Sequence, residues 1–508
     1  MREKYESIGI GDLKAIAKSR GIKGTSQMKK MEVVEAMLEL DAREAAENKE
    51  EAQAFKNVKE KETEQRSVVV QGEREARENN MIKEGGSGRE NNSSRENMTV
   101  RAGSSLKENS TAREGGSGRE NVPARESEFP GDLDSGITAS GILEVMPDGY
   151  GFIRCANYLP GENDVYVAPS QIRRFNMKTG DIVTGNTRIK TQSEKFSALL
   201  YVKNINGYLP DVAAKRGNFE DMTPIFPNER LRLETPEASI AMRIMDLISP
   251  IGKGQRGMIV SPPKAGKTTL LKEVAKSIKK NSPSTHLIIL LIDERPEEVT
   301  DIKEAIEGPN VEVIYSTFDE LPEHHKRVSE MVMERAKRLV EHKQDVCVLL
   351  DSITRLTRAY NLTVPPSGRT LSGGLDPASL HMPKRFFGAA RNMREGGSLT
   401  ILATALVNTG SKMDDVVYEE FKGTGNMEMV LDRKVAEKRV FPAIDIPQSG
   451  TRREDLLLSE EEMEAINHIR RAFNGLKSDE AVDKAVDLFK KTKNNREFVE
   501  MVKKTKFL

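Results

Sequence analysis

The sequence predicts a multidomain chain with a small N-terminal helical unit, a small β-barrel and a larger α/β domain. Its 508 residues are too many for one hydrophobic core, so several domains are expected. Short strands separated by turn residues occupy the middle of the chain, and aliphatic strands alternate with helical patterns in its second half. A charged stretch without a core separates the helical unit from the barrel and is predicted to be a disordered insertion.

Changes in composition set the predicted domain boundaries. They give a helical unit at 1–40, a charged linker with a disordered hexad-repeat insertion at 41–135, a barrel at 136–207, a connector at 208–235 and an α/β domain at 236–508. In the first unit, Leu13, Ile16 and Ala17 follow helical spacing, and Gly21 and Gly24 interrupt it. We therefore expect a helix, a break and a second helix there.

Charge and cysteine content exclude several classes of protein. Lys and Arg total 79, and so do Asp and Glu, so any nucleic-acid site must be a local patch. Cys155 and Cys347 are the only cysteines, which argues against a disulfide framework and fits a reducing compartment. The sequence contains neither a Cys-x-x-Cys motif nor a cluster of His residues, so nothing in it indicates a zinc site. Its longest aliphatic runs have the length of a β-strand and are too short to span a membrane. We expect a soluble, cytoplasmic protein without a membrane partner.

A six-residue period runs through the charged insertion. Basic residues recur at every sixth position from Arg77 to Arg125, and eight of these nine residues precede Glu. No aliphatic residue recurs with them, so they cannot fill the interior of a β-helix, and on an α-helix they form no face. Residues 77–130 are therefore predicted to be disordered, either as a tolerated repeat expansion or as a tether that gathers RNA or promotes assembly.

The predicted barrel carries aromatic residues on one strand face. Its strands are expected at 142–145, 150–154, 164–167 and 198–202. Tyr150 and Phe152 lie two residues apart and so share a face, and Tyr166 and Phe196 are candidates for the same surface. Exposed rings on a small barrel stack unpaired bases, whereas buried rings would form its core. Because 136–207 holds eight basic and six acidic residues, stacking would supply much of the binding.

The α/β domain contains a phosphate-loop motif. Its strands are predicted at 257–261, 287–293, 311–315, 346–351 and 399–406. Between the first strand and a helix, the chain reads Ser-Pro-Pro-Lys-Ala-Gly-Lys-Thr, which departs from G-x-x-x-x-G-K-[ST] only at Ser261. Backbone N–H groups and a helix dipole there suit a polyphosphate, with Lys267 on the β- and γ-phosphates and Thr268 on Mg²⁺. The alternative is a chance Gly-Lys-Thr at a helix start.

Two strand ends supply carboxylates at the edge of the sheet where such a site forms. Asp351 ends the fourth predicted strand and is the expected partner for Mg²⁺ through water. Glu294 follows the second strand and could polarise the attacking water, although either acid could instead cap a helix. Arg355 and Arg452 are candidates for offsetting charge on the γ-phosphate, and Arg452 from a neighbouring subunit would make hydrolysis depend on assembly.

Several longer sequence segments surround these motifs. In the α/β domain they are Pro-Pro-Lys-Ala-Gly-Lys-Thr at 262–268, Leu-Leu-Ile-Asp-Glu-Arg-Pro-Glu-Glu-Val-Thr at 290–300, Leu-Leu-Asp-Ser-Ile-Thr-Arg at 349–355, Pro-Lys-Arg-Phe-Phe-Gly-Ala-Ala-Arg at 383–391, Thr-Gly-Ser-Lys-Met-Asp at 409–414 and Tyr-Glu-Glu-Phe-Lys-Gly-Thr-Gly-Asn-Met-Glu at 418–428. In the barrel they are Asp-Gly-Tyr-Gly-Phe-Ile-Arg at 148–154 and Pro-Ser-Gln-Ile-Arg-Arg-Phe at 169–175. Together they resemble the family of bacterial transcription termination factor Rho. The resemblance covers about 136–508 well, covers 1–40 loosely and leaves out the hexads.

The resemblance implies an OB-fold, cold-shock-like barrel and a RecA-like α/β P-loop ATPase domain. It implies a ring-shaped homohexamer that hydrolyses ATP with Mg²⁺, translocates 5′ to 3′ along RNA and unwinds RNA–DNA hybrids. Such a ring releases transcripts from RNA polymerase, with elongation factors as further partners, and prefers single-stranded, C-rich RNA.

The resemblance also assigns roles to residues. The primary RNA site falls on the barrel residues Tyr150, Phe152, Arg154, Tyr166 and Phe196, and the secondary site falls in the ring channel, on Gly373, Gly374 and Lys412. The resemblance implies that the nucleotide is bound by Lys264, Ala265, Gly266, Lys267, Thr268 and Thr269, and that the metal is bound by Thr268 and Asp351. It implies catalytic roles for Lys267, Glu294, Arg355 and Arg452. Of these, Arg452 would act on the site of a neighbouring subunit. Relative to the commonest form of the family, Tyr150 and Phe196 exchange Phe and Tyr, which should preserve stacking. The family does not require Gly at position 261.

Two other functions fit parts of the sequence. A rotary ATP synthase-type subunit shares the sheet and the phosphate loop, but it would not need Tyr150 and Phe152 on a base-stacking face. An RNA-binding assembly protein would use the hexads of 77–130 as its active part, whereas an RNA-dependent ATPase motor would treat them as accessory. Comparing ATP hydrolysis with and without C-rich RNA tests the motor directly.

Overall fold

The computed structural model describes residues 9, 17, 28–36, 38, 133–191 and 194–505. The chain divides into two compact units, Met1–Glu120 and Asn121–Leu508. In the first unit, residues 30–36 are helical, and Ala17, Val33 and Val34 are buried together. The predicted hexad insertion at 77–130 lies outside the described residues.

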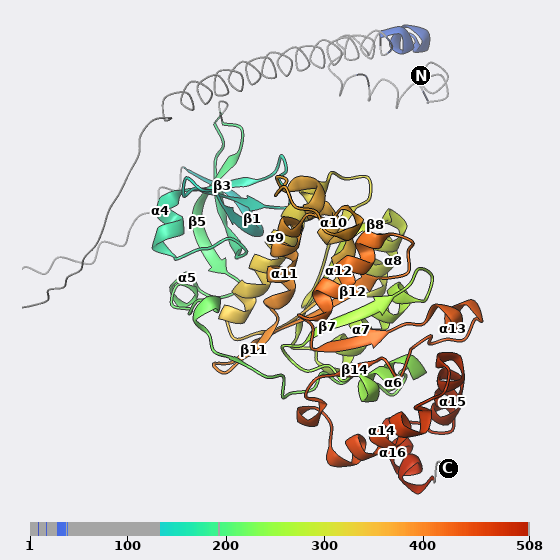
Figure 1. Ribbon diagram of the computed structural model, residues 1–508. Helices are drawn as coiled ribbons and strands as arrows, with labels where there is room; N and C mark the ends of the chain where they lie inside the picture. Colours follow the sequence, from blue (N-terminus) through green and yellow to red (C-terminus); the bar gives the residue numbers. More distant parts are fainter. Residues whose placement is uncertain are drawn as a thin grey trace, which may run out of the picture. The chain divides into compact units, whose positions relative to one another are not determined.

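A closed five-stranded barrel begins the second unit (Figure 1). Its elements are β1 (Asp134–Val145), β2 (Gly151–Arg154), β3 (Val165–Val167), α4 (Pro169–Arg174), β4 (Ile182–Arg188) and β5 (Ser197–Ile205). The strands close in the order β1-β2-β3-β5-β4, and β3 and β5 run parallel while the other neighbours run antiparallel. Leu143, Ile153 and Val183 are among the buried residues of its core. The predicted small barrel is therefore confirmed.

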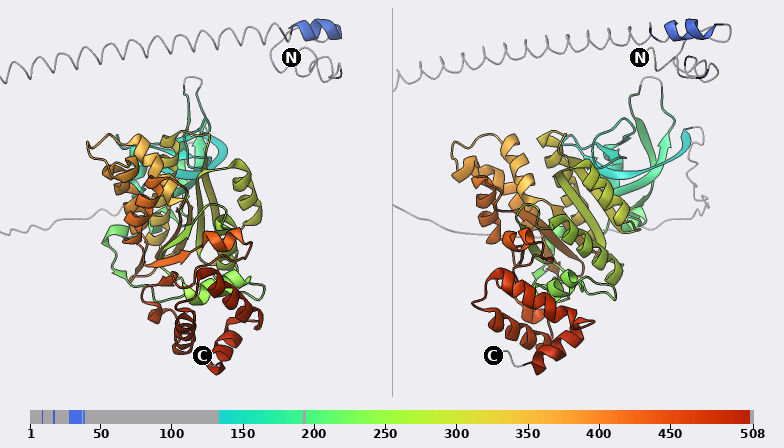
Figure 2. Two further views of the ribbon diagram at one scale, coloured as in Figure 1. Left: turned by 45° about the vertical axis from the view of Figure 1, so that its right-hand side comes forward. Right: turned by 90° about the vertical axis from the view of Figure 1, so that its right-hand side faces the viewer.

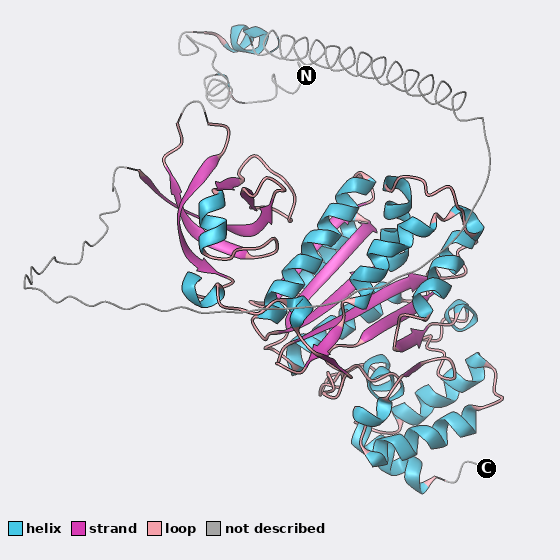
Figure 3. Cartoon of the chain, turned by 60° about the vertical axis from the view of Figure 1, so that its left-hand side comes forward, coloured by secondary structure: helices cyan, strands magenta, loops and turns pink. Residues whose placement is uncertain are grey.

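Among the described residues, a nine-stranded sheet forms the centre of the α/β domain (Figure 3). Its strands are β6 (Pro224–Ile225), β7 (Arg256–Ser261), β8 (His286–Glu294), β9 (Val311–Thr317), β10 (Asp345–Asp351), β11 (Arg391–Met393), β12 (Ser398–Leu406), β13 (Met427–Val430) and β14 (Gly450–Thr451). The main order is β14-β13-β7-β12-β10-β8-β9, with β11 pairing to β12 and β6 to β11. The strands from β13 to β9 in this order are parallel, as predicted for an alternating α/β chain.

Two hydrophobic cores lie on the two faces of this sheet. Along β8, Ile289 and Leu291 belong to one core, and Ile288 and Leu290 belong to the other, because successive side chains of a strand point to opposite faces. The first core includes residues of α6 (Ile240–Ile248), α7 (Lys267–Asn281) and α8 (Pro296–Ala305). The second includes residues of α9 (Pro322–Glu341), α10 (Ile353–Thr363), α11 (His381–Gly388) and α12 (Lys412–Lys422).

Three helices end the described chain, and they gather together (Figure 2). They are α14 (Glu460–Phe473), α15 (Ser478–Lys490) and α16 (Asn495–Lys504), and the rings of Phe489 and Phe498 stack 3.8 Å apart between the last two. The short elements are α5 (Pro210–Ala213), η1 (Phe219–Asp221), η2 (Ser372–Gly374), η3 (Pro377–Leu380), α13 (Arg433–Glu437) and η4 (Glu454–Leu456). Within the described ranges, none of the helices combines the length and the apolar character that a membrane span needs.

Helix α9 contacts the barrel as well as the sheet. A Cβ at Gly180 of the barrel would stand 2.4 Å from the carbonyl carbon of Glu334, so the two backbones approach closely. Arg335 Nη1 donates to Asn206 Oδ1 of the barrel at 2.8 Å. Arg216 of the connector donates to Glu341 of α9 at 2.8 Å and to Asp181 of the barrel at 2.7 Å. The C-terminal half of α9 therefore serves as the surface on which the barrel docks.

Candidate functional site

The phosphate loop lies between β7 and α7. Ser261 ends β7, and Lys267 begins α7. Gly266 takes a φ of 91°, a left-handed conformation that glycine adopts without a steric cost. The buried hydroxyl of Ser261 donates to the carbonyl of Pro262 at 2.9 Å. Serine is therefore accommodated at the position where the motif has glycine, and the loop leads into a helix N-terminus that suits phosphate.

Lys267 reaches two carboxylates at the carboxyl ends of neighbouring strands. Its Nζ lies 2.9 Å from Glu294 Oε1 on β8 and also forms an ion pair with Asp351 on β10. Thr404, on β12 between β7 and β10, donates its hydroxyl to Asp351 Oδ1 at 2.7 Å. The parallel sheet thus brings three predicted residues, far apart in the sequence, into one buried cluster.

This burial shifts the pKa values of the cluster. Burial, and then the charge of Asp351, raise the pKa of Glu294 to about 7. Burial disfavours the charge of Lys267, but Asp351 and Glu294 outweigh that effect and the pKa of Lys267 is raised. Near neutral pH, Glu294 therefore exchanges readily between its two forms, as a general base must, while Lys267 keeps its charge.

Arg355 and Thr268 lie beside these carboxylates. Arg355, at the start of α10, places Nη1 3.3 Å from Asp293 Oδ2 and Nε 3.8 Å from Glu294 Oε1. Thr268 Oγ1 lies 3.5 Å from Glu298 Oε2. Hydroxyl and carboxylate oxygens are the hard ligands that Mg²⁺ takes, and in the described ranges no group of three or more His, Cys, Asp or Glu could hold a metal. Thr268 and Asp351 therefore carry the kind of oxygen donor that would hold Mg²⁺.

A cavity of about 450 Å³ adjoins the phosphate loop. Its lining includes Lys264, Ala265, Gly266, Thr269, Leu431 and Phe441. The side chain of Phe441 is 49% exposed, and its ring carbons would lie 4.0 Å from a Cβ at Gly266. An exposed ring beside aliphatic side chains suits a planar base. Sequence reasoning missed Phe441, because its neighbours Val440, Pro442 and Ala443 are apolar and no motif marks it.

Arg452 lines a different cavity. It follows β14, is exposed, and shares a cavity of about 400 Å³ with Lys422, Gln448 and Arg470 but with no residue of the phosphate loop. Within one chain, the structure therefore does not bring Arg452 into the cluster of Lys267 and Glu294. A role for Arg452 in a neighbouring subunit stays a prediction.

Four aromatic rings form one surface of the barrel. Neighbouring ring centroids of Tyr150, Phe152, Tyr166 and Phe196 lie 5.2 to 6.0 Å apart, and we call this group the aromatic face. Phe152 is the cross-strand partner of Tyr166 and also of Glu144, so these side chains point the same way. All four rings are partly exposed and lie outside the barrel core. The interpretation of these rings as core residues is therefore wrong.

Two cationic residues lie against this face. Arg154 is only 6% exposed, and its guanidinium carbon lies 4.8 Å from the ring centroid of Phe152. Its Nε donates to Glu144 at 2.7 Å and its Nη1 to Asp164 at 2.5 Å, so its charge is already neutralised by protein. Lys195, which sequence reasoning missed, is exposed and holds Nζ 5.4 Å from the ring centroid of Phe196.

The two loops predicted for a channel lie side by side. A Cβ at Gly373 would stand 2.4 Å from the backbone nitrogen of Met413, which follows Lys412 at the start of α12. Gly374 has open space around its α-carbon, and its carbonyl accepts a hydrogen bond from Asn361 at 3.3 Å. Gly373, Gly374 and Lys412 therefore belong to one surface, whose contact with RNA stays a prediction.

Comparisons with known proteins agree with this arrangement. Family models match at residues 5–46 (Rho termination factor, N-terminal domain), 139–211 (Rho termination factor, RNA-binding domain) and 241–451 (ATP synthase alpha/beta family, nucleotide-binding domain). Transcription termination factor Rho of Pseudomonas aeruginosa is 56% identical over 373 residues, which are 72% of this chain and 88% of that protein. That of Bacillus subtilis is 56% identical over 363 residues, 71% and 84% of the two chains. The chain belongs to the transcription termination factor Rho family.

Membership of the Rho family confirms the resemblance found in the sequence strings. The nucleotide-binding domain is of the type found in ATP synthase subunits, but the Rho matches also cover the barrel and the N-terminal unit. The alternative of a rotary ATP synthase-type subunit, which shares the nucleotide-binding domain, is therefore wrong. Among solved structures, an ATPase of a type III secretion system superposes with a TM-score of 0.47 and 18% identity, covering 62% of this chain and 93% of that one. That similarity is too low to extend the functional comparison.

Proposed function

We propose that this Rho-family protein is an RNA-dependent ATPase that moves 5′ to 3′ along nascent RNA, unwinds RNA–DNA hybrids and releases the transcript from RNA polymerase. One observation carries the proposal: a nucleotide site with a poised carboxylate and a partly exposed aromatic face occur in one compact unit. The ATPase supplies the work, and the aromatic face supplies the RNA dependence. We place this activity in the cytoplasm, where nascent RNA and ATP meet.

At the nucleotide site, backbone N–H groups of Lys264 to Thr269 would surround the phosphates, and Phe441 would stack on the base. When ATP binds, Lys267 would leave Glu294 and Asp351 and pair with the β- and γ-phosphates. Phosphate oxygens are negatively charged, as the carboxylate oxygens are, so they can replace them as partners of the ammonium group. Glu294, released from Lys267, could then accept a proton from the attacking water.

Charge on the transferred phosphate must also be offset. Thr268, and Asp351 through water, would hold Mg²⁺, which supplies charge neutralisation at the phosphate oxygens when bound. Arg355 already lies beside Glu294 and would orient it. Arg452 would reach the γ-phosphate of the neighbouring subunit in a homohexameric ring, which explains why it lies away from its own phosphate loop.

The RNA would be bound at two places. Unpaired bases would stack on the aromatic face, each ring contributing roughly 1–3 kcal/mol, with a preference for C-rich segments. Gly373, Gly374 and Lys412 would contact the backbone in the ring channel, where nucleotide-driven movement of the loops pulls the strand. RNA polymerase and its elongation factors would then meet the protein through the transcript.

The proposal is tested by measuring ATP hydrolysis by the full chain with and without C-rich RNA. We expect RNA to raise the rate, and Lys267→Ala to abolish the RNA-stimulated rate. Lys272→Ala is the matched control, because Lys272 lies on the same helix and pairs with the exposed Asp301. Equal rates with and without RNA for the unmodified protein would contradict the proposal.

A further inference from the structure

The carboxylate of Glu144 is shared between the barrel and helix α9. Its Oε2 accepts from Arg154 Nε of the barrel at 2.7 Å, and both of its oxygens lie 2.7 Å from Arg327 Nη2 of α9. The side chain of Glu144 is 16% exposed, and that of Arg327 is 36% exposed. One carboxylate therefore links the two domains through two charge-assisted hydrogen-bonding partners, which are stronger than neutral ones.

On the barrel side, Glu144 is tied to the aromatic face. It is the cross-strand partner of Phe152, and Arg154, two residues further along the same strand, holds its guanidinium against the Phe152 ring. A base stacked on Phe152 would meet a ring whose position depends on Arg154, and the position of Arg154 depends on Glu144. A base on the aromatic face would therefore meet this carboxylate through Phe152 and Arg154, the latter also held by Asp164.

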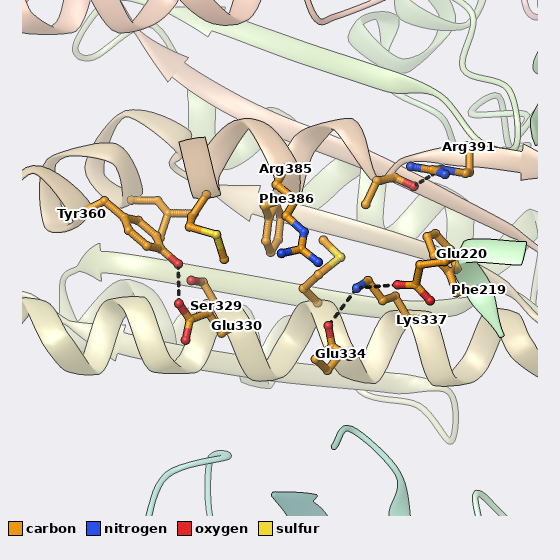
Figure 4. A pocket seen from close by; sticks show the side chains of 14 residues that line it. Phe219, Glu220, Ser329, Glu330, Glu334, Lys337, Tyr360, Arg385, Phe386 and Arg391 are labelled. Carbon is orange, nitrogen blue, oxygen red and sulfur yellow. Dashed lines mark hydrogen bonds and ion pairs between the residues drawn. The ribbon is translucent and has the colours of Figure 1, made fainter. Parts of the chain in front are cut away.

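On the other side, α9 packs against α10, which begins directly after Asp351. Glu330 lies one turn after Arg327 on α9, and its Oε1 accepts from the hydroxyl of Tyr360 on α10 at 2.9 Å (Figure 4). Helix α10 also carries Arg355, whose Nε lies 3.8 Å from Glu294 Oε1. Two helices therefore span the distance between Glu144 and the catalytic carboxylate.

The ion pair is not needed to hold the barrel in place. Separate contacts at the C-terminal half of α9 dock the barrel, including the close approach of Gly180 and the pairing of Arg216 with Glu341. The connector adds the backbone N–H of Phe219, which donates to Glu341 at 3.1 Å. Loss of the Arg327 side chain should thus leave the barrel docked while removing the ion pair between α9 and Glu144.

We propose that the Arg327–Glu144 ion pair couples RNA on the aromatic face to the nucleotide site, with Arg327 as a positioning residue. This inference rests on the proposed RNA-dependent ATPase. A base on Phe152 favours one arrangement of Arg154 and Glu144, and the pair passes that preference to α9 and α10, which position Arg355 beside Glu294. RNA then shifts an equilibrium of the two helices by its differential affinity for the two arrangements.

The test uses Arg327→Met in the full chain, with three readouts. We expect C-rich RNA to bind with unchanged affinity in fluorescence anisotropy, and the rate without RNA to stay unchanged. The maximal RNA-stimulated rate should fall roughly fivefold or more, the lower end of typical coupling between sites. Arg327→Lys, which can still pair with Glu144, should recover most of the stimulation.

Arg338→Met is the matched control, because it removes the same charge from the same helix. Arg338 pairs with Glu334 and Glu341 of α9 itself and makes no contact with the aromatic face in the described structure. In this variant Glu341 keeps Arg216 and the N–H of Phe219 as partners, so the docking contacts remain. The variant should keep its stimulation even if its thermal midpoint falls. If Arg327→Met itself unfolds, Arg327→Gln replaces it, because a neutral amide removes the ion pair with Glu144. The same loss of stimulation with unchanged RNA affinity is expected.

Three results separate the possibilities. Full stimulation in Arg327→Met would overturn the inference and leave the proposed function intact. Parallel loss of RNA affinity and stimulation would also overturn it, because Arg327 would then act only on RNA binding. Absence of stimulation in the unmodified protein would remove the proposed function first, and the coupling with it.

Discussion

Lys267 neutralises two buried carboxylates in this structure. Without its ammonium group, the buried Asp351 would lose its ion-pair partner, and breaking a buried pair costs about 3–5 kcal/mol. The positive charge of Lys267 is also what a bound triphosphate needs as a counter-charge. A single side chain therefore stabilises the nucleotide-free cluster and prepares it for a ligand that replaces the carboxylates.

The raised pKa of Glu294 predicts how hydrolysis depends on pH. A general base must be ionised, and the pKa of Glu294 is raised to about 7, so kcat/KM for ATP should rise as the pH increases through that value. Steady-state hydrolysis at saturating RNA measures this profile. Glu294→Gln should be nearly inactive and should lack the ascending limb. A profile that is flat below neutrality would contradict the role of Glu294 as the base.

Phe152 predicts the strength of RNA binding at the barrel. Phe152→Ala removes a partly exposed ring and should weaken binding of C-rich RNA by roughly 1–3 kcal/mol, or about 5- to 150-fold in Kd. Fluorescence anisotropy measures the change. Phe226→Ala removes a phenylalanine that is 62% exposed outside the barrel and should have little effect. Unchanged affinity in Phe152→Ala would rule out base stacking on this face.

Local motifs predicted those site residues that are neighbours in the sequence or that lie at the ends of strands. Lys267, Asp351 and Glu294 were predictable because parallel strands end at one edge of the sheet. Phe441 was not, because its place beside Gly266 is a contact between segments distant in the sequence. The neutralisation of Arg154 by Glu144 and Asp164 was not either, because it depends on the register in which neighbouring strands of the barrel pair. No spacing rule in a single sequence reports such a contact.

At the scale of elements, α9 is a helix with two roles, since one face fills a core of the α/β domain and another docks the barrel. Gly180 marks the docking contact. With a φ of 96°, it lies where any side chain would be strained, and a Cβ would collide with the backbone of Glu334. Because the neighbouring atoms belong to the backbone of α9, they cannot move aside as a flexible side chain could.

Gly180→Ala should therefore destabilise the docked barrel. We expect a loss of about 1–3 kcal/mol or more in unfolding free energy, from backbone strain and the collision together. Gly207→Ala is the control, because Gly207 has a φ of 81° but open space around it, so only strain is added. Denaturant unfolding of both variants provides the measurement. Equal losses would show that the close approach to α9 carries no energetic weight.

The strands that could be predicted from the sequence share an unambiguous hydrophobic pattern. Strands β8 and β10 are runs of aliphatic residues buried on both faces, so their pattern is unambiguous. Strand β4 and the first half of β1 were missed because they contain Gly, Ser, Thr and Asn, several of which have low strand propensity. Their pairing with each other closes the barrel, and that closure is a tertiary effect.

At the scale of the whole molecule, the nucleotide site and the aromatic face belong to the unit Asn121–Leu508, and most of the hexad insertion at 77–130 lies before that unit in the sequence. Deletion of 77–130 should leave ring formation and RNA-stimulated hydrolysis largely intact, because nothing in the proposed mechanism requires that segment. Analytical ultracentrifugation and the hydrolysis assay check both properties. Loss of both would instead support an assembly function for the hexads.

Transcript release on a defined template tests the central claim most directly. A purified RNA polymerase elongating a C-rich transcript is incubated with the protein and ATP, and released RNA is separated from RNA held in the complex. We predict ATP-dependent release of shortened transcripts, lost in Lys267→Ala and strongly reduced in Phe152→Ala. If RNA stayed bound to polymerase while RNA-stimulated hydrolysis was normal, the protein would be an RNA-dependent ATPase that does not terminate transcription.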